Sequence, residues 1–443
     1  MNPEIVDKVR AAGVVGAGGA GFPTHVKLQF EAEQVLANGA SCEPLLNSDP
    51  YLLEAFASDV IDGLKIVMDV ANAGIGTVCI KSKHHTAVAA VEEKIDAHNT
   101  KRINLAELED FYPAGDEFIL VNEVLKKIVP EGGIPLNVLT VVCNVESLLN
   151  VSRATRGKPV TDRYLTVCGE VDQPMICRAP IGTSAEEVIQ KAGGPTIGDA
   201  AVVMGGPMMG RVLETTAEPV VKTTSGIIVL PRHHNVIRDK QKDLERMRFI
   251  AKSACTQCSR CTDLCPRNLI GHSLEPHKIM RHLAYKPGMT GKVLEDALIC
   301  SECGVCEKFA CPMMLSPREI NAAIKRKLLA EGVKREPKRE TYRVSPFKDT
   351  RKVPISRLLE RLDVARYNTH PQFADISIQP DKVAIPLQQH IGKPCEAAVK
   401  TGSVVKRGDL IGEIPEGALG ARIHASIDGR VTSVDQGQVV IER

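Results

Sequence analysis

The sequence predicts a multidomain α/β protein, and three observations support this fold class. The chain has 443 residues, too many for one core when a domain usually holds about 100–200 residues. Strand-like apolar runs alternate with helical stretches in its first third. Eight of its 14 cysteines crowd between residues 255 and 311. We expect structural units at residues 1–155, 156–232, 233–335 and 379–443, with a linker and helix at 336–378.

The first unit, residues 1–155, alternates strands and helices. An amphipathic helix is expected at Pro3–Ala12, a glycine-rich loop at Gly13–Gly21, and a periodic helical stretch at Asp49–Val70. The apolar runs GTVCI and NVLTVVCNV are typical of buried strands. This alternation favours an α/β domain.

Two further units are predicted to be small and rich in strands. Residues 156–232 contain the runs RYLTVCGEV, AAVVMGGPMMG and GIIVL, with one helix, SAEEVIQKAGG, closed by glycine. This pattern predicts a β-grasp-like unit, in which strands surround one helix. Residues 379–443 show short strands between Gly and Asp-Gly turns, which predict a small β-sandwich or barrel.

The cysteine-bearing unit is expected to be α-helical. Helical stretches are predicted at Asn235–Lys252 and Ser273–Ala297, before and between the two cysteine groups. A basic helix, REINAAIKRKLLAEG, follows Pro317. The charged, proline-containing run VKREPKRETYRVSPFKDTRK comes next, and we expect it to be a solvated linker.

The cysteines form two motifs typical of a two-cluster ferredoxin. The first is C-x2-C-x2-C-x3-C-P, and the second repeats it with one extra residue before its last cysteine. In this arrangement three close thiolates bind one cubane and the fourth cysteine binds the other. We therefore assign one [4Fe–4S] cluster to Cys255, Cys258, Cys261 and Cys311, and a second to Cys300, Cys303, Cys306 and Cys265.

A pair of structural zinc sites is the alternative, because two C-x2-C pairs can form a tetrahedral thiolate site. Zinc would leave four cysteines and both following prolines, Pro266 and Pro312, unexplained. The sequence therefore favours iron–sulfur clusters.

The composition argues against nucleic acid and membrane lipid as partners. Lys and Arg number 56 against 54 Asp and Glu, a net charge of +2, so no global field draws the chain to nucleic acid or anionic lipid. No apolar run approaches the roughly 18 residues of a membrane helix, and the amino terminus lacks a signal-peptide pattern. We expect a soluble, cytoplasmic protein.

Two histidine pairs and one methionine pair are not expected to bind a metal. The pairs His84-His85 and His233-His234 are expected to be solvated, and Met208-Met209 is expected to provide flexible packing.

The glycine-rich loop formally satisfies G-x-G-x-x-G at Gly16, Gly18, Gly19 and Gly21. A helix is predicted before it, whereas a dinucleotide-binding fingerprint follows a strand. The motif alone is therefore weak, and a flexible turn is the alternative. A loop of glycines nevertheless lets the backbone approach a flat cofactor or a phosphate closely.

Longer segments carry a specific resemblance. VVGAGGAGFPTHVKL at residues 14–28 resembles the flavin and NADH loop shared by the 51-kDa flavoprotein subunit of respiratory complex I and the C subunit of the Rnf electron-transport complex. Successive Rnf subunit motifs are similar to NGASCEPLLNSDP, YPAGDEFILVNEVLKKIVPEGGIP, VVCNVESL, MGGPMMG and VKTTSGIIVL. The resemblance implies an FMN-binding α/β domain that oxidises NADH, a soluble-ligand-binding β-grasp domain, an α-helical two-cluster ferredoxin domain and a barrel-sandwich hybrid domain.

The order of these domains is informative. In the Rnf subunit the barrel-sandwich hybrid segment precedes the flavin domain, whereas here the matching residues, IPLQQHIGKPCEAAVKTGSVVKRGDLIGEI and IHASIDGRV, come last. That order resembles the cobalamin reductases of propanediol-utilisation microcompartments. The segment lacks the lysine of a modified lipoyl or biotinyl hairpin, so we expect it to serve in docking.

The resemblance also implies roles for individual residues. The four loop glycines would line the FMN and NADH cleft, Phe22 would pack near the nucleotide, and Lys27 would offer charge to a phosphate. Polar positions near the flavin and nicotinamide are matched by Asn38, Glu43, Glu117 and Asn144. Ordinary cap and turn roles are the alternative for these four. No protein nucleophile is required, because a flavin accepts a hydride and releases electrons singly.

The implied function is NADH-driven electron transfer through FMN and two [4Fe–4S] clusters to a corrinoid or another acceptor protein. The chain would work in the cytoplasm, inside or attached to a microcompartment, with its shell or enzymes as further partners. An Rnf-like subunit feeding a membrane redox complex is one alternative. A non-enzymatic iron–sulfur adaptor with an inactive flavin site is the other.

Overall fold

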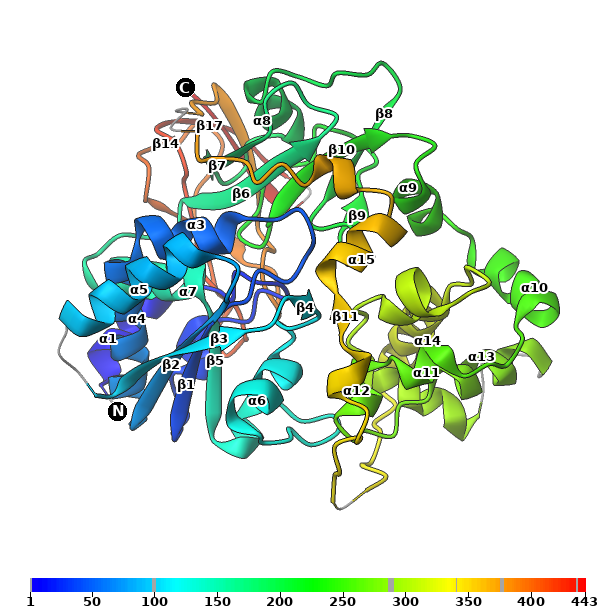
Figure 1. Cartoon of the computed structure of the whole chain (residues 1–443). Coiled ribbons are helices and arrows are strands. Elements are labelled where there is room, and N and C mark those ends of the chain that lie inside the picture. The colour runs from blue at the N-terminus through cyan, green and yellow to red at the C-terminus, as the bar shows by residue number, and fades with distance from the viewer. Residues whose placement is uncertain (1, 98–100, 286–290, 340, 375–377, 436) are drawn as a thin grey trace.

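The computed structural model describes residues 2–97, 101–285, 291–339, 341–374, 378–435 and 437–443. Figure 1 shows the parallel sheet of the amino-terminal unit on one side of the molecule and the helical, cysteine-bearing unit on the other. The strands of the β-grasp unit lie above them in this view.

A parallel sheet with the strand order β3-β2-β1-β5 forms the amino-terminal unit. The predicted runs GTVCI and NVLTVVCNV contain the buried strands β2 and β5, although β5 begins only at Thr140, because Asn137 and Val138 belong to η1. Because β2 and β3 lie on one side of β1 and β5 on the other, the carboxyl ends of β1 and β5 form a topological switch point, where such sheets bind ligands. The elements of the unit are α1 Pro3–Ala11, α2 Thr24–Lys27, β1 Gln34–Gly39, α3 Ser48–Ala55, α4 Ala57–Val70, β2 Ile75–Lys81, α5 His85–Ala97, β3 Ile103–Leu108, β4 Phe111–Tyr112, α6 Glu117–Leu125, η1 Pro135–Val138, β5 Thr140–Asn144 and α7 Val145–Thr155.

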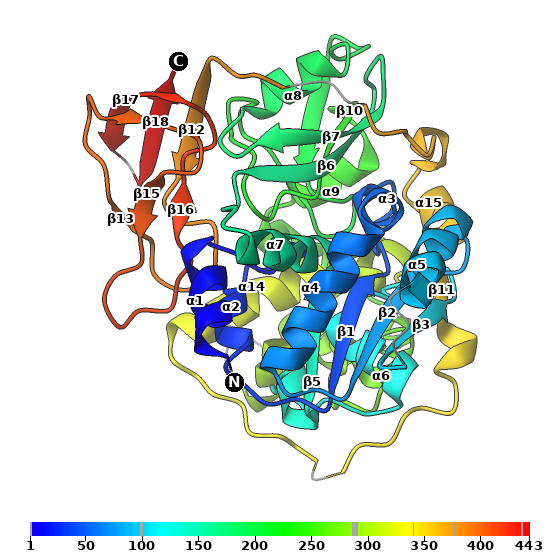
Figure 2. The ribbon, with the colours of Figure 1, turned by 90° about the vertical axis from the view of Figure 1, so that its left-hand side faces the viewer.

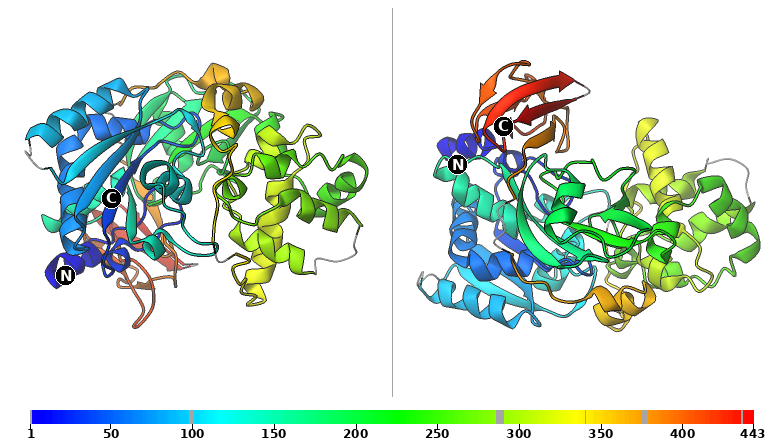
Figure 3. Two further views of the ribbon diagram at one scale, coloured as in Figure 1. Left: turned by 60° about the horizontal axis from the view of Figure 1, so that its bottom comes forward. Right: turned by 90° about the horizontal axis from the view of Figure 1, so that it is seen from above.

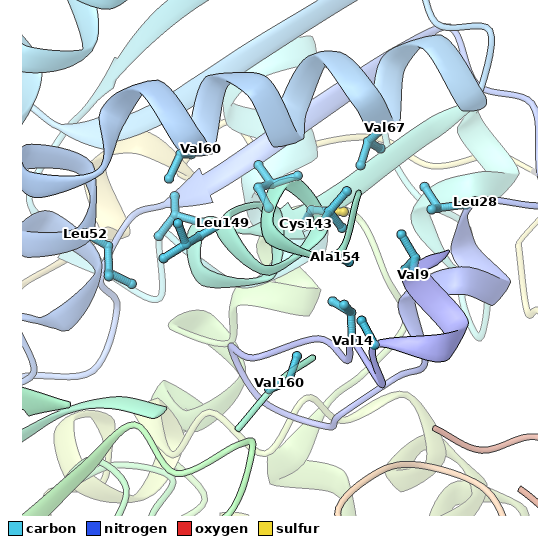
Figure 4. Packing of buried hydrophobic residues seen from close by; sticks show 14 of the residues in the cluster. Val9, Val14, Leu28, Leu52, Val60, Val67, Cys143, Leu149, Ala154 and Val160 are labelled. Carbon is cyan, nitrogen blue, oxygen red and sulfur yellow. The ribbon is translucent and has the colours of Figure 1, made fainter. Parts of the chain in front are cut away.

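Helices α4 and α7 pack closely and bury the main core of this unit. A Cβ on Gly63 of α4 would lie 2.0 Å from the carbonyl oxygen of Leu148 on α7, so glycine is needed for this approach. Figure 4 shows Val60 and Val67 of α4 in the same apolar cluster as Cys143 of β5. The sheet and its strand ends are thereby held rigidly.

The second unit has the predicted β-grasp form. Its sheet has the order β7-β6-β10-β8-β9, with one parallel pair, β6 and β10. Helix α8 begins where the Ser184 side chain accepts a hydrogen bond from the backbone of Glu187, 3.1 Å away. Two glycines with positive φ, Gly193 and Gly194, follow its end. The elements are β6 Asp162–Gly169, β7 Met175–Pro180, α8 Ala185–Lys191, β8 Ala200–Met204, β9 Arg211–Val212 and β10 Gly226–Pro231.

The carboxy-terminal unit is a pair of small sheets, β12-β18-β17-β14 and β13-β15-β16. Figure 2 shows it standing beside α1 and α2. Its Ile385, Ile411 and Ile423 are buried in the same apolar cluster as Val14 and Val160, so it docks on the amino-terminal unit through a shared core. Its strands are β12 Lys382–Pro386, β13 Glu396–Ala397, β14 Val404–Val405, β15 Leu410–Glu413, β16 Ile423–His424, β17 Gly429–Asp435 and β18 Gln438–Glu442.

The cysteine-bearing unit is helical, as predicted, but its helix limits differ. Asn235–Lys252 forms two helices, because Asp243 caps a new one at Leu244. The Ser273–Ala297 stretch contains α13 and η2, while residues 286–290 lie outside the described residues. The basic helix after the cysteines is confirmed as α14. The elements are α9 Asn235–Lys240, α10 Leu244–Ala254, α11 Arg260–Asp263, α12 Pro266–Leu269, α13 Pro276–Tyr285, η2 Lys292–Ile299, η3 Cys306–Ala310 and α14 Pro317–Ala330.

The segment after α14 is mostly exposed, as its charge predicts, but it is also anchored to the other units at several points. The Arg335 guanidinium is 3% exposed and forms ion pairs with Glu131 (2.7 Å) and Asp296 (3.0 Å). Farther on, β11 pairs with β4 of the amino-terminal unit. Figure 3 shows the segment passing between the amino-terminal and helical units. The partners of these cations are acids far away in the sequence, which a local charge pattern does not reveal. The segment contains η4 Asp349–Arg351, β11 Val353–Pro354, α15 Ile355–Arg361 and η5 Ala365–Tyr367.

One member of each histidine pair also departs from expectation. His234 is 6% exposed and caps α9, since its Nδ1 accepts from the backbone N–H of Val236 at 3.2 Å. His84 is half-buried, and burial lowers its pKa to about 4. The solvated prediction therefore fits only His85 and His233, which are exposed.

Candidate functional site

The glycine-rich loop lies at the switch point of the parallel sheet. The backbone N–H of Ala17 donates to the Ser147 hydroxyl (2.9 Å) on α7, directly after β5. A Cβ on Gly18 would lie 3.3 Å from the Asn144 side chain, whereas a Cβ on Gly19 would meet no atom within 4 Å. The loop therefore rests on the end of β5 and leaves open space at Gly19.

The two outer glycines of the motif have structural roles. The backbone N–H of Gly16 donates to the carbonyl of Phe22 at 2.9 Å, which closes the loop. Gly21 has a φ of +71°, and a Cβ there would lie 3.0 Å from the carbonyl oxygen of Gln389 in the carboxy-terminal unit. The loop is thus fixed at its far end by the docked unit.

Three predicted residues meet beside the loop. The Lys27 ammonium lies 3.4 Å from the Glu117 carboxylate, 3.0 Å from the carbonyl oxygen of Val142 on β5, and 5.9 Å from the centre of the Phe22 ring. Burial opposes the charge of Lys27, but Glu117 and Cys143 outweigh it, so the Lys27 pKa is raised. A permanent positive charge is therefore held at the edge of the site.

Asn38 and Asn144 lie at the carboxyl ends of β1 and β5, the two strands that flank the switch point. The Asn38 amide donates to the carbonyl of Gly115 at 2.9 Å, which ties the loop of residues 112–118 to the end of β1. The Asn144 amide donates to the Asp49 carboxylate at 3.2 Å, and its oxygen caps α7. Both side chains thus have ordinary structural partners at the predicted cofactor position, and their contact with a flavin stays a prediction.

Glu43 follows β1 in the sequence, but its carboxylate faces the β-grasp unit. Its carboxylate accepts hydrogen bonds from the backbone N–H groups of Met208 and Met209, both at 2.9 Å. A Cβ on Gly206 would lie 2.0 Å from this carboxylate. Burial raises the Glu43 pKa, against the effect of these bonds and of Lys240. Met208 is buried, as the packing prediction requires, whereas Met209 is half exposed. The MGGPMMG loop is also held by the hydrogen bonds to Glu43.

The first set of cysteines lies at the molecular surface and is here called the outer group: Cys255, Cys258, Cys261 and Cys311. Burial raises the pKa of Cys261 to about 12, and the adjacent thiols of the other three raise it further. These cysteines line one cavity with Met280 and Met313. Cys258 is exposed. The four residues assigned together from the sequence are therefore brought together.

The second set is buried and is here called the inner group: Cys265, Cys300, Cys303 and Cys306. Burial, then the thiols of Cys300, Cys303 and Cys265, raise the pKa of Cys306 well above its ordinary value. All four are buried. Among the described residues, no set of three or more His, Cys, Asp or Glu side chains is drawn together tightly enough to hold a metal ion. The role of the eight cysteines as cluster ligands stays a prediction.

The two cysteine motifs share one backbone form. Positive φ occurs at Gln257 and Ser259 in the first motif and at the equivalent Glu302 and Gly304 in the second. Such left-handed residues turn the chain so that successive thiols face a common centre, and they leave backbone N–H groups free to point at sulfur. The N–H groups of Glu302 and Leu315 lie 3.4 Å from the sulfurs of Cys300 and Cys311. This donor set fits two thiolate-bound clusters.

The inner group touches the loop that borders the switch point. The Tyr112 hydroxyl donates to the carbonyl oxygen of Cys303 at 2.6 Å. Arg267, two residues after Cys265, pairs with Asp116 at 3.0 Å and stacks 3.6 Å above the Phe118 ring. The described residues lining the cavity at the outer group all come from the helical unit. The inner group is therefore proximal to the switch point, and the outer group is distal.

Sequence reasoning missed a buried ion pair that joins the first two units. The Arg163 guanidinium on β6 pairs with the Glu146 carboxylate on α7, and both side chains are 2% exposed. Arg163 also donates to the carbonyl of Thr224 at 2.6 Å. Arg163 directly follows Asp162 in the sequence, and no local signal pairs it with Glu146.

Comparison with protein families matches each unit. Residues 9–153 match the Nuo51 FMN-binding domain, residues 164–212 the SLBB domain, residues 254–316 the 4Fe–4S dicluster domain, and residues 366–442 the RnfC barrel-sandwich hybrid domain. The predicted multidomain fold class is thus confirmed. These domains define an electron-transfer flavoprotein of the FMN and 4Fe–4S type.

Curated relatives place the chain more closely. It is 40% identical over 442 residues to the cobalamin reductase PduS of Salmonella typhimurium, covering 99% of this chain and 96% of that protein. A cobalamin reductase PduS of Citrobacter freundii matches equally well, at 40% over 441 residues. The chain belongs to the PduS family of oxidoreductases, which shares its domains with the RnfC and Nuo51 proteins.

More distant likenesses cover less of the chain. A component of the Na⁺-translocating ferredoxin:NAD⁺ oxidoreductase complex of Acetobacterium woodii is 33% identical over 276 residues, which is 61% of this chain and 59% of that protein. An NAD⁺-reducing [NiFe]-hydrogenase in the H2-reduced state shares the fold, with a TM-score of 0.50 and 21% identity over 75% of this chain and 62% of that one. Within the described residues, no helix is both long and apolar enough to cross a membrane.

Proposed function

We propose that this chain oxidises NADH and passes the electrons through FMN and two [4Fe–4S] clusters to a corrinoid or another acceptor protein. The observation that carries the proposal is the 2.6 Å hydrogen bond from Tyr112 to Cys303. It joins the loop beside the switch point to the inner cysteine group. Such a contact holds the FMN-binding domain and the cluster ligands close together, which favours electron transfer between them.

The residues at the switch point suit a flavin nucleotide. Gly19 faces open space and Gly18 allows close approach to the end of β5, while Lys27 supplies positive charge. Asn38, Asn144 and Glu117 would present polar atoms around the same edge. FMN would accept two electrons as a hydride and release them one at a time. Glu43 would act mainly by fixing the MGGPMMG loop, because its carboxylate is already engaged.

Along the path of the electrons, the cluster of the inner group would come first and the cluster of the outer group second. The inner group contacts residues 112–118 through Tyr112 and Arg267. The outer group lies beyond it and includes the exposed Cys258. Electrons from the flavin domain would therefore meet the inner group first and leave from the outer one.

Two further points rest on the relatives. The likeness to cobalamin reductase PduS supports a corrinoid as the final acceptor and a cytoplasmic, microcompartment-associated location. The likeness to the Acetobacterium woodii complex supports the second candidate, an Rnf-like subunit that feeds a membrane complex. Full-length similarity favours the first.

The test is anaerobic purification with iron, sulfide and flavin quantified on one sample, then absorbance before and after NADH. About eight irons per chain, and FMN bleached by NADH, are expected. Iron without flavin, or a flavin that NADH leaves oxidised, would contradict the dehydrogenase and support the adaptor alternative.

A matched pair of glycine variants tests the flavin position. Gly19→Ala places a methyl group in the open space of the loop, so FMN content should fall while the fold is retained. Gly74→Ala is the control, because a Cβ at Gly74 likewise meets no atom within 4 Å and Gly74 precedes β2 at the opposite end of the sheet. Equal flavin content in the two variants would show that the flavin does not bind beside Gly19.

A further inference from the structure

The outer cysteine group opens on an apolar surface. Met313 and Met314, directly after the Cys311-Pro312 pair, are 44% and 70% exposed. Cys258 and Pro312 are exposed beside them, and Met313 shares the outer-group cavity with the cysteines. Exposed methionines next to a redox site are adaptable contacts that suit binding of another protein.

Unpaired cations surround this patch. Lys252 is three residues before Cys255, Arg260 lies between Cys258 and Cys261, and Arg281 follows Met280, which lines the cavity. All three are exposed, and none forms an ion pair with any residue that the structure describes. Burial is the main cause of the lowered pKa of His277, another residue lining the cavity, and the charge of Arg281 also contributes, which places Arg281 nearby.

The acids of the same helices do not cancel this charge. Glu245 pairs with Arg248, Glu275 with Lys278, and Asp263 with Arg351. The local surface is therefore positive although the whole chain carries only +2. Helices α10, α11 and α13 lie at the end of the molecule away from the parallel sheet (Figure 1), so a partner can approach without meeting the other units.

We propose that this surface, formed by Lys252, Arg260, Arg281, Met313 and Met314 around the outer cysteines, docks an acidic electron-carrier protein. The inference rests on the proposed function and names the class of partner. An apolar centre excludes water at the point of transfer, while the cations attract and orient an acidic partner from a distance. Such steering is weakened by salt, because the Debye length is about 8 Å at physiological ionic strength.

The test measures binding without NADH. An acidic plant-type [2Fe–2S] ferredoxin is titrated into the anaerobic holoprotein at low and high salt, with basic cytochrome c as the opposite-charge probe. The wild type is expected to bind the ferredoxin at low salt. The double variant Lys252→Glu/Arg281→Glu is expected to raise the Kd about tenfold or more. Met314→Ser should weaken binding without changing its salt dependence.

The control is Lys400→Glu/Lys406→Glu, the same charge change on exposed residues of the carboxy-terminal unit. No ferredoxin binding by the wild type, tighter binding of cytochrome c than of ferredoxin, or equal weakening by the two double variants would overturn the proposal. NADH-driven reduction of a small dye by the wild type reports the proposed function separately. Failure there, with ferredoxin binding retained, would reject NADH oxidation and leave the docking surface standing.

Discussion

The Tyr112 hydroxyl donates a 2.6 Å hydrogen bond to the backbone carbonyl of Cys303. Tyr112 belongs to the flavin domain and is 2% exposed, so the bond is a buried contact between the two redox units. Removing one hydrogen bond of this kind costs about 1 kcal/mol and loosens the groups that it joins.

Tyr112→Phe should therefore slow electron passage from flavin to clusters while NADH still bleaches the flavin. Stopped-flow absorbance after mixing with NADH separates the two events. Tyr367→Phe is the matched control, because it removes a 2.6 Å bond to Glu170 in the β-grasp unit, a bond that involves no cysteine. An equal effect of both variants would mean that Tyr112 acts only through overall stability.

Glu43→Gln should destabilise the junction between the flavin and β-grasp units. A glutamine offers one acceptor oxygen and sets its own N–H group against the second backbone donor of the Met208-Met209 pair. Leaving a fully buried donor unpaired costs about 1–3 kcal/mol, and the loss here should lie at the lower end because the bond to Met209 is exposed.

Hydrogen exchange should accordingly become faster at Met208 and Met209, and the urea midpoint should fall. Glu416→Gln, on an exposed turn, should stay within about 0.5 kcal/mol of the wild type. Unchanged exchange in Glu43→Gln would show that the carboxylate does not hold the loop in solution.

Removing only one partner of the Arg163–Glu146 ion pair is expected to lower the free energy of unfolding strongly. Arg163→Met leaves the Glu146 carboxylate buried without its cation, a loss of about 3–5 kcal/mol. Adding Glu146→Gln removes the stranded charge, so the double variant should be more stable than Arg163→Met alone. Urea unfolding measures both. Lys382→Met, which breaks the exposed pair with Glu442, should cost at most about 1 kcal/mol.

Local patterns predicted much of this molecule. Strands β2 and β5, helix α14 and the two cysteine motifs follow from residues close together in sequence. The resemblance to known flavoproteins supplied the domain order and the switch-point residues. The contacts that the sequence did not reveal join distant residues: Glu43 with Met208, Tyr112 with Cys303, and Arg335 with Glu131. Charge and polarity at one position do not identify a partner 100 or more residues away. The resemblance therefore places Glu43 near the flavin and nicotinamide without revealing the Met208-Met209 loop, and local charge predicts a solvated linker after α14 without revealing its anchors.

The buried Lys222 should make the free energy of unfolding depend on pH. Its ammonium lies 2.7 Å from the carbonyl oxygen of Gly13 and 2.6 Å from that of Arg422, so it joins the β-grasp unit, the start of the glycine-rich loop and the carboxy-terminal unit. Burial lowers the Lys222 pKa from 10.5 to about 7, against a small opposing effect of Cys395. Between these values the unfolded chain holds a proton that the folded chain lacks, so stability should rise with pH.

From about pH 7 to about 8.5 this difference amounts to about 1–2 kcal/mol. Burial lowers the pKa of the neighbouring His424 to about 3, so it does not titrate there in the folded state. Burial raises the pKa of Cys395 to about 11, whereas an unfolded thiol titrates near about 8.5, so Cys395 offsets part of the rise at the upper end of this range. Lys222→Met should lower stability at every pH, because two carbonyls lose their donor, and should flatten the rise. Urea midpoints at several pH values measure the slope, with the exposed Lys400→Met as the control. A slope that survives in Lys222→Met would show that another group sets it.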